Sequence, residues 1–215
     1  MTIEIWSDVM CPFCYIGKRH LEKALDQFGN KESIDIIWKS FQLNPNMPEN
    51  TDENVYEYLA KAKGISYDES IQMHEQVEQM AAKAGLNYQF EKASVSNSFK
   101  AHRVLHMAKR RHLGDKLKEE LLHAYFMEGI NMSNEDALVK LGERVGLDRS
   151  EVELALNDET FSDYVKADIQ EAADIGVRGV PFFVFNRKYA ISGAQPVESF
   201  LDTLEKVQKE AKDAH

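Results

Sequence analysis

Residues 3–28 read IEIWSDVMCPFCYIGKRHLEKALDQF, and this stretch decides the fold of the chain. Apolar Ile3 and Ile5 alternate with polar Thr2 and Glu4, which predicts a short strand over residues 3–6. From Pro12 to Phe28 the apolar residues recur at helical spacing, which predicts a helix. Pro12 suits the first helical position, where its missing N–H costs no hydrogen bond. A strand therefore runs into a helix, and a Cys-x-x-Cys pair lies at their junction.

The two cysteines of this junction, Cys11 and Cys14, are the only cysteines in the chain. In the first turn of a helix, residues three apart share a face and are close enough to form and break a disulfide. Cys11 lies at the helix N-terminus, where free N–H groups and the helix dipole favour a thiolate. Cys14 lies one turn deeper. The spacing therefore predicts that Cys11 attacks a disulfide and Cys14 resolves the mixed disulfide.

Beyond this junction, residues 34–41 are dense in β-branched and aromatic side chains and predict a second strand. Residues 182–185 and 189–192 predict a hairpin around a turn, and residues 196–211 predict a last amphipathic helix. Between the second strand and the hairpin the pattern is helical. We expect helices over 55–63, 67–84, 97–112, 115–128, 134–145, 149–156 and 160–175, with Gly64, Gly85, Gly114, Gly129 and Gly146 at their joints.

The order is therefore β-α-β, a block of helices, and α-β-β-α. It predicts an α/β fold in which residues 1–50 plus 157–215 build one discontinuous domain, interrupted by a helical insertion over residues 51–156. The first two strands are expected to be parallel, because a helix connects them, and the last two to be antiparallel.

The composition excludes several classes of protein. Lys and Arg number 26 against 36 Asp and Glu in 215 residues, a net charge of −10, so nucleic acid and anionic membranes are poor partners. No run approaches the roughly 18 apolar residues of a membrane helix. Two cysteines exclude a disulfide-stapled scaffold. The first residues lack the pattern of a signal peptide, so we expect a cytoplasmic protein.

A second mark is Val180-Pro181, which opens a strand after a glycine-containing turn. Together with the Cys-x-x-Cys helix and the strand order, it resembles the thioredoxin superfamily, in which a cis-proline loop lies beside the active-site cysteines. The resemblance extends to the FrnE-like branch of the DsbA family. It is carried by residues 7–17 (SDVMCPFCYIG), 97–103 (NSFKAHR), 125–129 (YFMEG) and 176–184 (GVRGVPFFV).

This resemblance implies a thioredoxin fold interrupted by a large all-helical insertion, and thiol–disulfide oxidoreduction or disulfide isomerisation. Substrate would be a protein disulfide or a small-thiol disulfide, glutathione included, and a reducing partner would reset the cysteine pair. Val180 and Pro181 would position the substrate, with Phe13, Tyr15 and Phe182 in apolar contact around the sulfurs. The chemistry requires no metal and no organic cofactor, and a homodimer is compatible with it.

The chain departs from periplasmic DsbA oxidants at Phe13. Those proteins typically carry histidine there, whose positive ring can stabilise the thiolate, whereas the apolar Phe13 cannot. Asp8, close in sequence, should raise the pKa of Cys11 further by like-charge repulsion. We therefore expect a less oxidising couple and a reductase or isomerase.

Two other functions are compatible with parts of the sequence. The cysteine pair could be a zinc half-site shared across a dimer, since a structural zinc site needs four ligands. Alternatively, Asn97 and His102 could line a small-molecule cleft. Proteins resembling 2-hydroxychromene-2-carboxylate isomerases and kappa-class glutathione transferases use such a cleft. They usually carry serine at the position of Cys11, so the intact pair favours the oxidoreductase.

Overall fold

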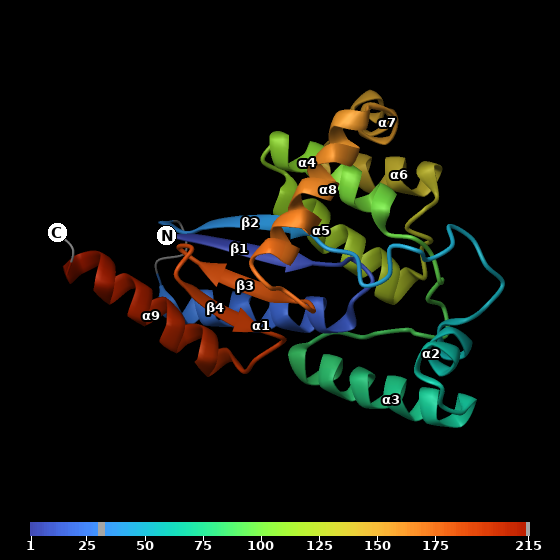
Figure 1. Cartoon of the computed structure of the whole chain (residues 1–215), viewed down its shortest axis with the longest axis horizontal. Coiled ribbons are helices and arrows are strands. Elements are labelled where there is room, and N and C mark those ends of the chain that lie inside the picture. Colours follow the sequence, from blue (N-terminus) through green and yellow to red (C-terminus); the bar gives the residue numbers. More distant parts are fainter. Residues whose placement is uncertain (30–32, 214–215) are drawn as a thin grey trace. The chain divides into compact units, whose positions relative to one another are not determined.

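The computed structural model describes residues 1–29 and 33–213 (Figure 1). Residues 30–32 and 214–215, which belong to the predicted domain 1–50 plus 157–215, lie outside the described residues. The chain divides into two compact units, Met1–Leu43 with Ala167–His215, and Asn44–Lys166.

The first unit is an α/β unit whose strands and helices alternate as predicted. Its elements are β1 (Thr2–Ser7), α1 (Pro12–Phe28), β2 (Asp35–Ser40), the second half of α8 (Glu159–Asp174), β3 (Phe182–Phe185), β4 (Tyr189–Ser192) and α9 (Val197–Asp213). The sheet order is β2-β1-β3-β4. Strands β1 and β2 are parallel, and β3 pairs antiparallel with both β1 and β4, which confirms the predicted strand directions.

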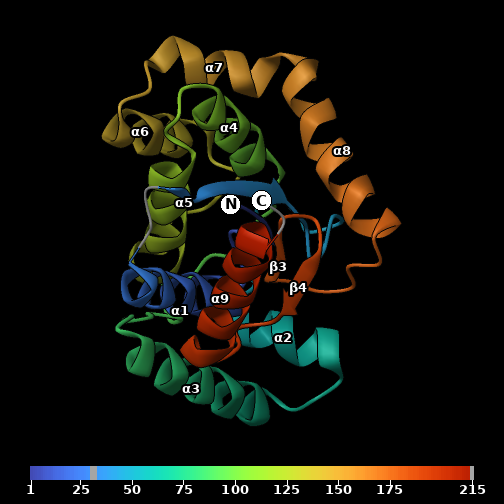
Figure 2. The same cartoon turned by 90° about the vertical axis from the view of Figure 1, so that its left-hand side faces the viewer.

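Both faces of this sheet are covered, which explains why β1 is buried almost from end to end. Helices α1 and α9 pack against each other on one side (Figures 1 and 2). On the other side, Trp6 of β1 packs in one cluster with Ala172 of α8 and with Val177 and Val184. The Trp6 indole N–H also donates to the backbone oxygen of Asp168 at 3.0 Å. Burying such a side chain stabilises the fold by roughly 1.5–3 kcal/mol.

The second unit consists mainly of helices, as the sequence predicts for this part of the chain. They are α2 (Val55–Lys63), α3 (Tyr67–Ala84), α4 (Phe99–Arg110), α5 (Gly114–His123), η2 (Ala124–Glu128), α6 (Glu135–Val145), α7 (Arg149–Asn157) and the first half of α8. Asn134 caps α6 by accepting a hydrogen bond from the Ala137 N–H at 2.9 Å. Four of the predicted joint glycines, Gly64, Gly85, Gly129 and Gly146, end helices in the left-handed conformation.

Two details of the helical prediction are wrong. Gly114 does not end a helix but begins α5, and the left-handed position falls instead on His112, with φ 56°. The helix predicted over residues 115–128 changes its hydrogen bonding at Ala124, where one turn of π-helix begins. Such a turn inserts a residue without changing the apolar pattern enough to be seen in the sequence.

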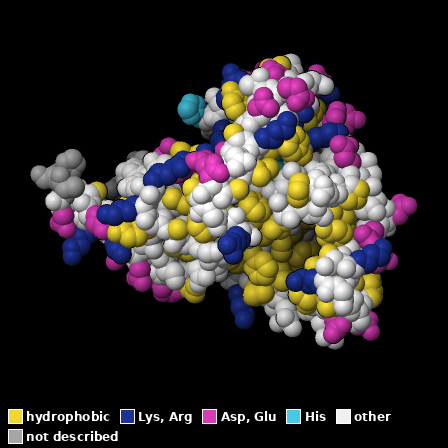
Figure 3. Space-filling model, in the orientation of Figure 1, with side chains coloured by type: hydrophobic (Ala, Val, Ile, Leu, Met, Phe, Trp, Pro, Cys, Tyr) yellow, Lys and Arg dark blue, Asp and Glu magenta, His cyan; other side chains and the backbone are white. Residues whose placement is uncertain are grey.

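The surface carries charged side chains of both signs, scattered over the face in Figure 3. Within the part of the chain that the structure describes, no helix is long and apolar enough to cross a membrane.

Candidate active site

The Cys-x-x-Cys pair lies where β1 ends and α1 begins. Cys11 is the N-cap of α1, with extended backbone at φ −89° and ψ 114°, and Pro12 occupies the first helical turn. The Cys14 N–H donates to the Cys11 carbonyl oxygen at 3.0 Å, which closes the turn that carries both sulfurs. Both side chains are free thiols and nearly buried, with 3% of Cys11 and 1% of Cys14 exposed.

Val180 and Pro181 lie beside the first cysteine. The Cys11 thiol donates to the Val180 carbonyl oxygen, with 3.5 Å between the sulfur and the oxygen. The peptide bond between Val180 and Pro181 is cis. The Pro181 carbonyl oxygen accepts a hydrogen bond from the Gly193 N–H at 2.8 Å, which ties this loop to the end of β4. The fold thus brings the two sequence motifs into direct contact.

Asp8 is a buried acid three residues before Cys11. One carboxylate oxygen accepts from the Met10 N–H at 3.5 Å, and the other from the Leu43 N–H at 2.9 Å. The Asp8 carbonyl oxygen accepts from the Cys11 N–H at 3.3 Å. Asp8 therefore ties the turn before the cysteines to the chain that follows β2, and it holds a carboxylate close to the sulfurs.

The environment of the cysteine pair disfavours a charge on Cys11. The pKa of its thiol is raised well above the usual range, first by the hydrogen bond with the Cys14 side chain and then by burial. The charge of Cys14 raises this pKa as well, and that of Asp8 adds a smaller effect in the same direction. The Cys14 backbone lowers it. Two like charges on neighbouring sulfurs repel, so the pair resists a double thiolate.

Gly17 is a site residue for which the sequence pattern predicts no role. A Cβ on Gly17 would lie 3.0 Å from the Cγ of Pro181 and 3.1 Å from the Cζ of Phe183. The absence of a side chain therefore lets α1 approach the Val180-Pro181 loop. A lone glycine inside a helical pattern was the signal that could have pointed to this close approach.

The three aromatic residues predicted around the sulfurs differ in exposure. Phe13 is 40% exposed, and Phe182 is half-buried. Tyr15 is buried, and its hydroxyl accepts a hydrogen bond from the Arg19 guanidinium at 3.2 Å. The Arg19 guanidinium also lies over the Tyr15 ring, 4.8 Å from its centre. Phe13 thus presents the largest apolar surface of the three to solvent.

Asn97 and His102, the candidates for a cleft, belong to the helical unit. The Asn97 side-chain amide donates to the carbonyl oxygens of Pro45 and Met47, at 3.1 and 2.8 Å, and accepts from the Phe99 N–H at 2.9 Å. Its polar atoms are thus engaged inside this unit. His102 lies in α4 and is fully buried.

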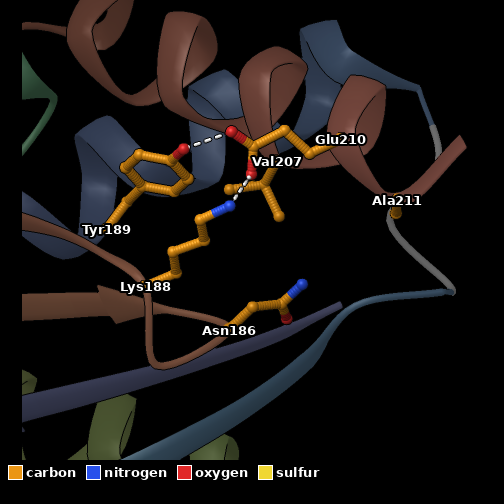
Figure 4. A pocket seen from close by; sticks show the side chains of 6 residues that line it. All are labelled: Asn186, Lys188, Tyr189, Val207, Glu210 and Ala211. Atoms are coloured by element: carbon orange, nitrogen blue, oxygen red, sulfur yellow. Dashed lines mark hydrogen bonds and ion pairs between the residues drawn. The ribbon is translucent and has the colours of Figure 1, made fainter. Parts of the chain in front are cut away.

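A cavity of about 180 Å³ lies between the β3–β4 turn and α9, and Figure 4 shows its lining side chains. Lys188 and Tyr189 both point to Glu210 there and bind its carboxylate. None of the predicted site residues lines this cavity. Within residues 1–29 and 33–213, no group of three or more His, Cys, Asp or Glu side chains could hold a metal ion.

The comparisons with known proteins place this geometry in a family. An uncharacterised protein of Bacillus subtilis, YwbO, is 28% identical over 209 residues, which are 96% of this chain and 97% of that protein. The crystal structure of a probable DsbA oxidoreductase from Streptomyces coelicolor is 35% identical. It has a TM-score of 0.91, over 98% of this chain and 91% of that one.

A cytosolic disulfide reductase, DsbM of Pseudomonas aeruginosa, shares the fold at 16% identity. Its TM-score is 0.69, over 97% of this chain and 99% of that one. The family model described as a DSBA-like thioredoxin domain matches residues 2–205. The thioredoxin fold with a helical insertion, expected from the sequence, is thereby confirmed. The chain belongs to the family of DSBA-like thioredoxin domain proteins, the thiol oxidoreductases of the DsbA type.

Proposed function

We propose that this chain is a dithiol–disulfide oxidoreductase that reduces or isomerises the disulfides of proteins or small thiols. One observation carries the proposal. The Cys11 sulfur lies 3.5 Å from the carbonyl oxygen of Val180, directly before the cis-proline, with the Cys14 thiol one helical turn away. Two thiols and a backbone carbonyl oxygen that could pair with an extended substrate thus lie close together, which supports the proposed roles of nucleophile, resolving thiol and substrate edge.

The reaction proceeds in two exchanges. The Cys11 thiolate attacks one sulfur of the substrate disulfide, which forms a mixed disulfide and releases the other substrate sulfur as a thiolate that takes up a proton. Cys14 then loses its proton and attacks the Cys11 sulfur, which releases the second substrate thiol. Two electrons pass to the substrate, and the Cys11–Cys14 disulfide remains. Two glutathione molecules, or one dithiol partner of the thioredoxin type, return the pair to the reduced state and are themselves oxidised to a disulfide.

The surroundings of Cys11 support reduction or isomerisation over oxidation. A strong oxidant stabilises its thiolate, and so its reduced form. Here the hydrogen bond with Cys14, burial and the nearby charges raise the pKa of Cys11, and Phe13 supplies no positive charge. A reducing couple of this kind suits the cytoplasm, where thiols are kept reduced, so we propose that compartment.

The backbone of Val180 supports pairing with an extended substrate. Its carbonyl oxygen faces the Cys11 thiol, and its N–H makes no hydrogen bond within the described part of the chain. A substrate segment can donate to and accept from such an edge as an added strand does. Phe13, the exposed aromatic residue between the cysteines, offers apolar contact next to it.

The direct test is reduction of insulin, or refolding of a scrambled disulfide protein, by the wild-type chain and by Cys11→Ser. We expect both activities in the wild type and a loss of at least 100-fold in the variant, because serine is a far weaker nucleophile towards sulfur. Activity that survives Cys11→Ser would contradict the proposal.

A glutathione-dependent isomerase or transferase is the alternative function, and a zinc-binding module is the third. The hydrogen bonds of the Asn97 amide support the oxidoreductase, because a ligand would have to displace them. The isomerase predicts turnover of an aromatic substrate without Cys14. The zinc module predicts stoichiometric zinc after gentle purification.

A further inference from the structure

Arg178 is an exposed cation on the loop that carries the candidate substrate edge. It lies two residues before Val180, whose carbonyl oxygen accepts from the Cys11 thiol. Two residues span at most about 7 Å, so Arg178 originates close to the reactive sulfur. Val177 and Val180, on either side of it, both pack against the cluster around Trp6. The backbone of Arg178 is thus held between two anchored neighbours.

Arg178 differs from the other arginines and several lysines of its unit in having no acidic partner. It makes no hydrogen bond or ion pair within residues 1–29 and 33–213. The paired cations are Arg19 with Glu22 at 2.7 Å, Lys39 with Glu171 at 2.8 Å, Arg187 with Glu171 at 2.6 Å, and Lys188 with Glu210 at 2.6 Å. The positive charge of Arg178 is therefore left for a ligand.

Arg178 acts against the Asp8 carboxylate, which is buried close to the sulfurs and raises the pKa of Cys11, although the first turn of α1 itself contains no acidic residue. A guanidinium presents several N–H donors in a plane and binds a carboxylate with two parallel hydrogen bonds. A carboxylate is therefore the group that this rim recognises best.

We propose that Arg178 is a specificity-determining residue that favours disulfides with a carboxylate next to the attacked cysteine. This inference rests on the proposed oxidoreductase function and names its substrate class. Such carboxylates occur in acidic protein segments and in oxidised glutathione, whose glycine carboxylate follows the cysteine. The chain as a whole carries a net charge of −10 and repels anions, so a preference for them must come from a local cation.

The test measures how fast the reduced chain is oxidised by paired peptide disulfides. The symmetric disulfide of acetyl-Gly-Cys-Glu-amide is compared with that of acetyl-Gly-Cys-Gln-amide, and oxidised glutathione with its ester at the glycine carboxylates. Remaining protein thiols are counted after acid quenching. We expect the wild type to react about two- to fivefold faster with each carboxylate-bearing disulfide, as for an exposed ion pair. The preference should fall towards one in 1 M salt.

Two variants assign this preference to Arg178. Arg178→Gln should bring the Glu-to-Gln rate ratio to about one, and Arg178→Glu should bring it below one. Lys23→Gln is the matched control. Lys23 is exposed on α1, makes no ion pair within the described residues, and lies 12 residues from Cys11, about 18 Å along the helix. Lys23→Gln removes the same charge as Arg178→Gln, but from a position beyond the screening length. It should therefore keep the wild-type Glu-to-Gln rate ratio.

The outcomes separate this inference from the function on which it rests. A wild-type ratio of one, or a ratio unchanged in Arg178→Gln, overturns the role of Arg178 and leaves the oxidoreductase standing. A wild-type chain that reacts with none of these disulfides contradicts both. A preference in the peptide pair alone assigns the site to acidic protein segments, and a preference in the glutathione pair alone assigns it to the small thiol.

Discussion

The Cys11 thiol donates a hydrogen bond to the Val180 carbonyl oxygen across a sequence separation of 169 residues. The contact joins the start of α1 to the loop before β3, and it exists because β3 pairs antiparallel with β1. The nucleophile and the substrate edge are therefore positioned by the same sheet. Substitutions around the sulfurs should therefore change the chemistry of the cysteines, whereas substitutions in the packing of α1 against this loop should also change stability.

The two cysteine variants should differ in how much mixed disulfide they accumulate. With a disulfide of a small chromophoric thiol, Cys14→Ser should accumulate close to one mixed disulfide per chain, because Cys11 attacks and nothing resolves the product. Cys11→Ser should accumulate far less. Mass spectrometry of the intact chain measures both. Equal labelling of the two variants would contradict the assigned roles.

Asp8→Asn should make Cys11 more acidic. The Asp8 charge raises the pKa of Cys11, so its removal should shift the rise of the attack rate to lower pH and speed the reaction at pH 7. In the wild type the rate should keep rising above the ordinary thiol range, near pH 8.5. The measurement is the pH dependence of Cys11 alkylation by iodoacetamide, followed by mass spectrometry in chains that keep Cys14. Asp26→Asn, on the exposed side of α1, should leave the profile unchanged.

Phe13→His should make the couple more oxidising. A protonated imidazole between the cysteines stabilises the Cys11 thiolate and hence the reduced form, which raises the reduction potential. Each tenfold change in the equilibrium with glutathione corresponds to about 30 mV for this two-electron couple. Equilibration in glutathione buffers measures the potential. Phe13→Leu, which adds no charge, is the control, and an equal shift in both variants would exclude the electrostatic explanation.

Gly17→Ala should weaken both stability and catalysis. The new methyl group would press on Pro181 and on the buried Phe183, and such overpacking costs roughly 1–3 kcal/mol. The better helix propensity of alanine returns up to about 1 kcal/mol, so we expect a net loss of about 1 kcal/mol. Urea unfolding gives the stability, and insulin reduction should slow because Pro181 moves. Lys23→Ala, exposed on the same helix, should affect neither.

Glu171→Gln should lower stability more at neutral pH than in acid. Burial opposes ionisation of Glu171, but its hydrogen bonds with Lys39 and Arg187 outweigh burial and lower its pKa. The stabilisation is therefore present above the unfolded pKa near 4.3 and is lost as pH falls through the lower folded value.

For such a partly exposed pair we expect Glu171→Gln to lower the free energy of unfolding by about 1 kcal/mol at pH 7, as measured by urea unfolding, and by less at pH 4. Glu205→Gln, an exposed carboxylate of α9 with no ion pair within the described residues, is the control. A difference for Glu171→Gln that stays constant with pH would contradict the electrostatic account.

Much of the fold could be predicted because its signals are local. The alternation over residues 2–5, the helical spacing from Pro12 to Phe28 and the apolar pair of strands at 182–185 and 189–192 each reflect the period of one element. The Cys-x-x-Cys spacing follows from the pitch of a single turn. Details that leave this pattern unchanged, such as the π-helical turn at Ala124, could not be predicted in this way.

By itself, then, the sequence determined which residues form the strands and helices, and it placed Cys11 and Cys14 on one helical turn. The family resemblance, and no local pattern, implied that the Val180-Pro181 loop lies beside the cysteines. Only the tertiary structure decided that the Val180 carbonyl oxygen accepts from the Cys11 thiol, that the Asp8 carboxylate binds the Leu43 N–H, and that Gly17 lies against Pro181. These contacts join distant parts of the chain. They arise because β1 buries both of its faces and so draws β3, α1 and α8 around it, an arrangement that no local period encodes.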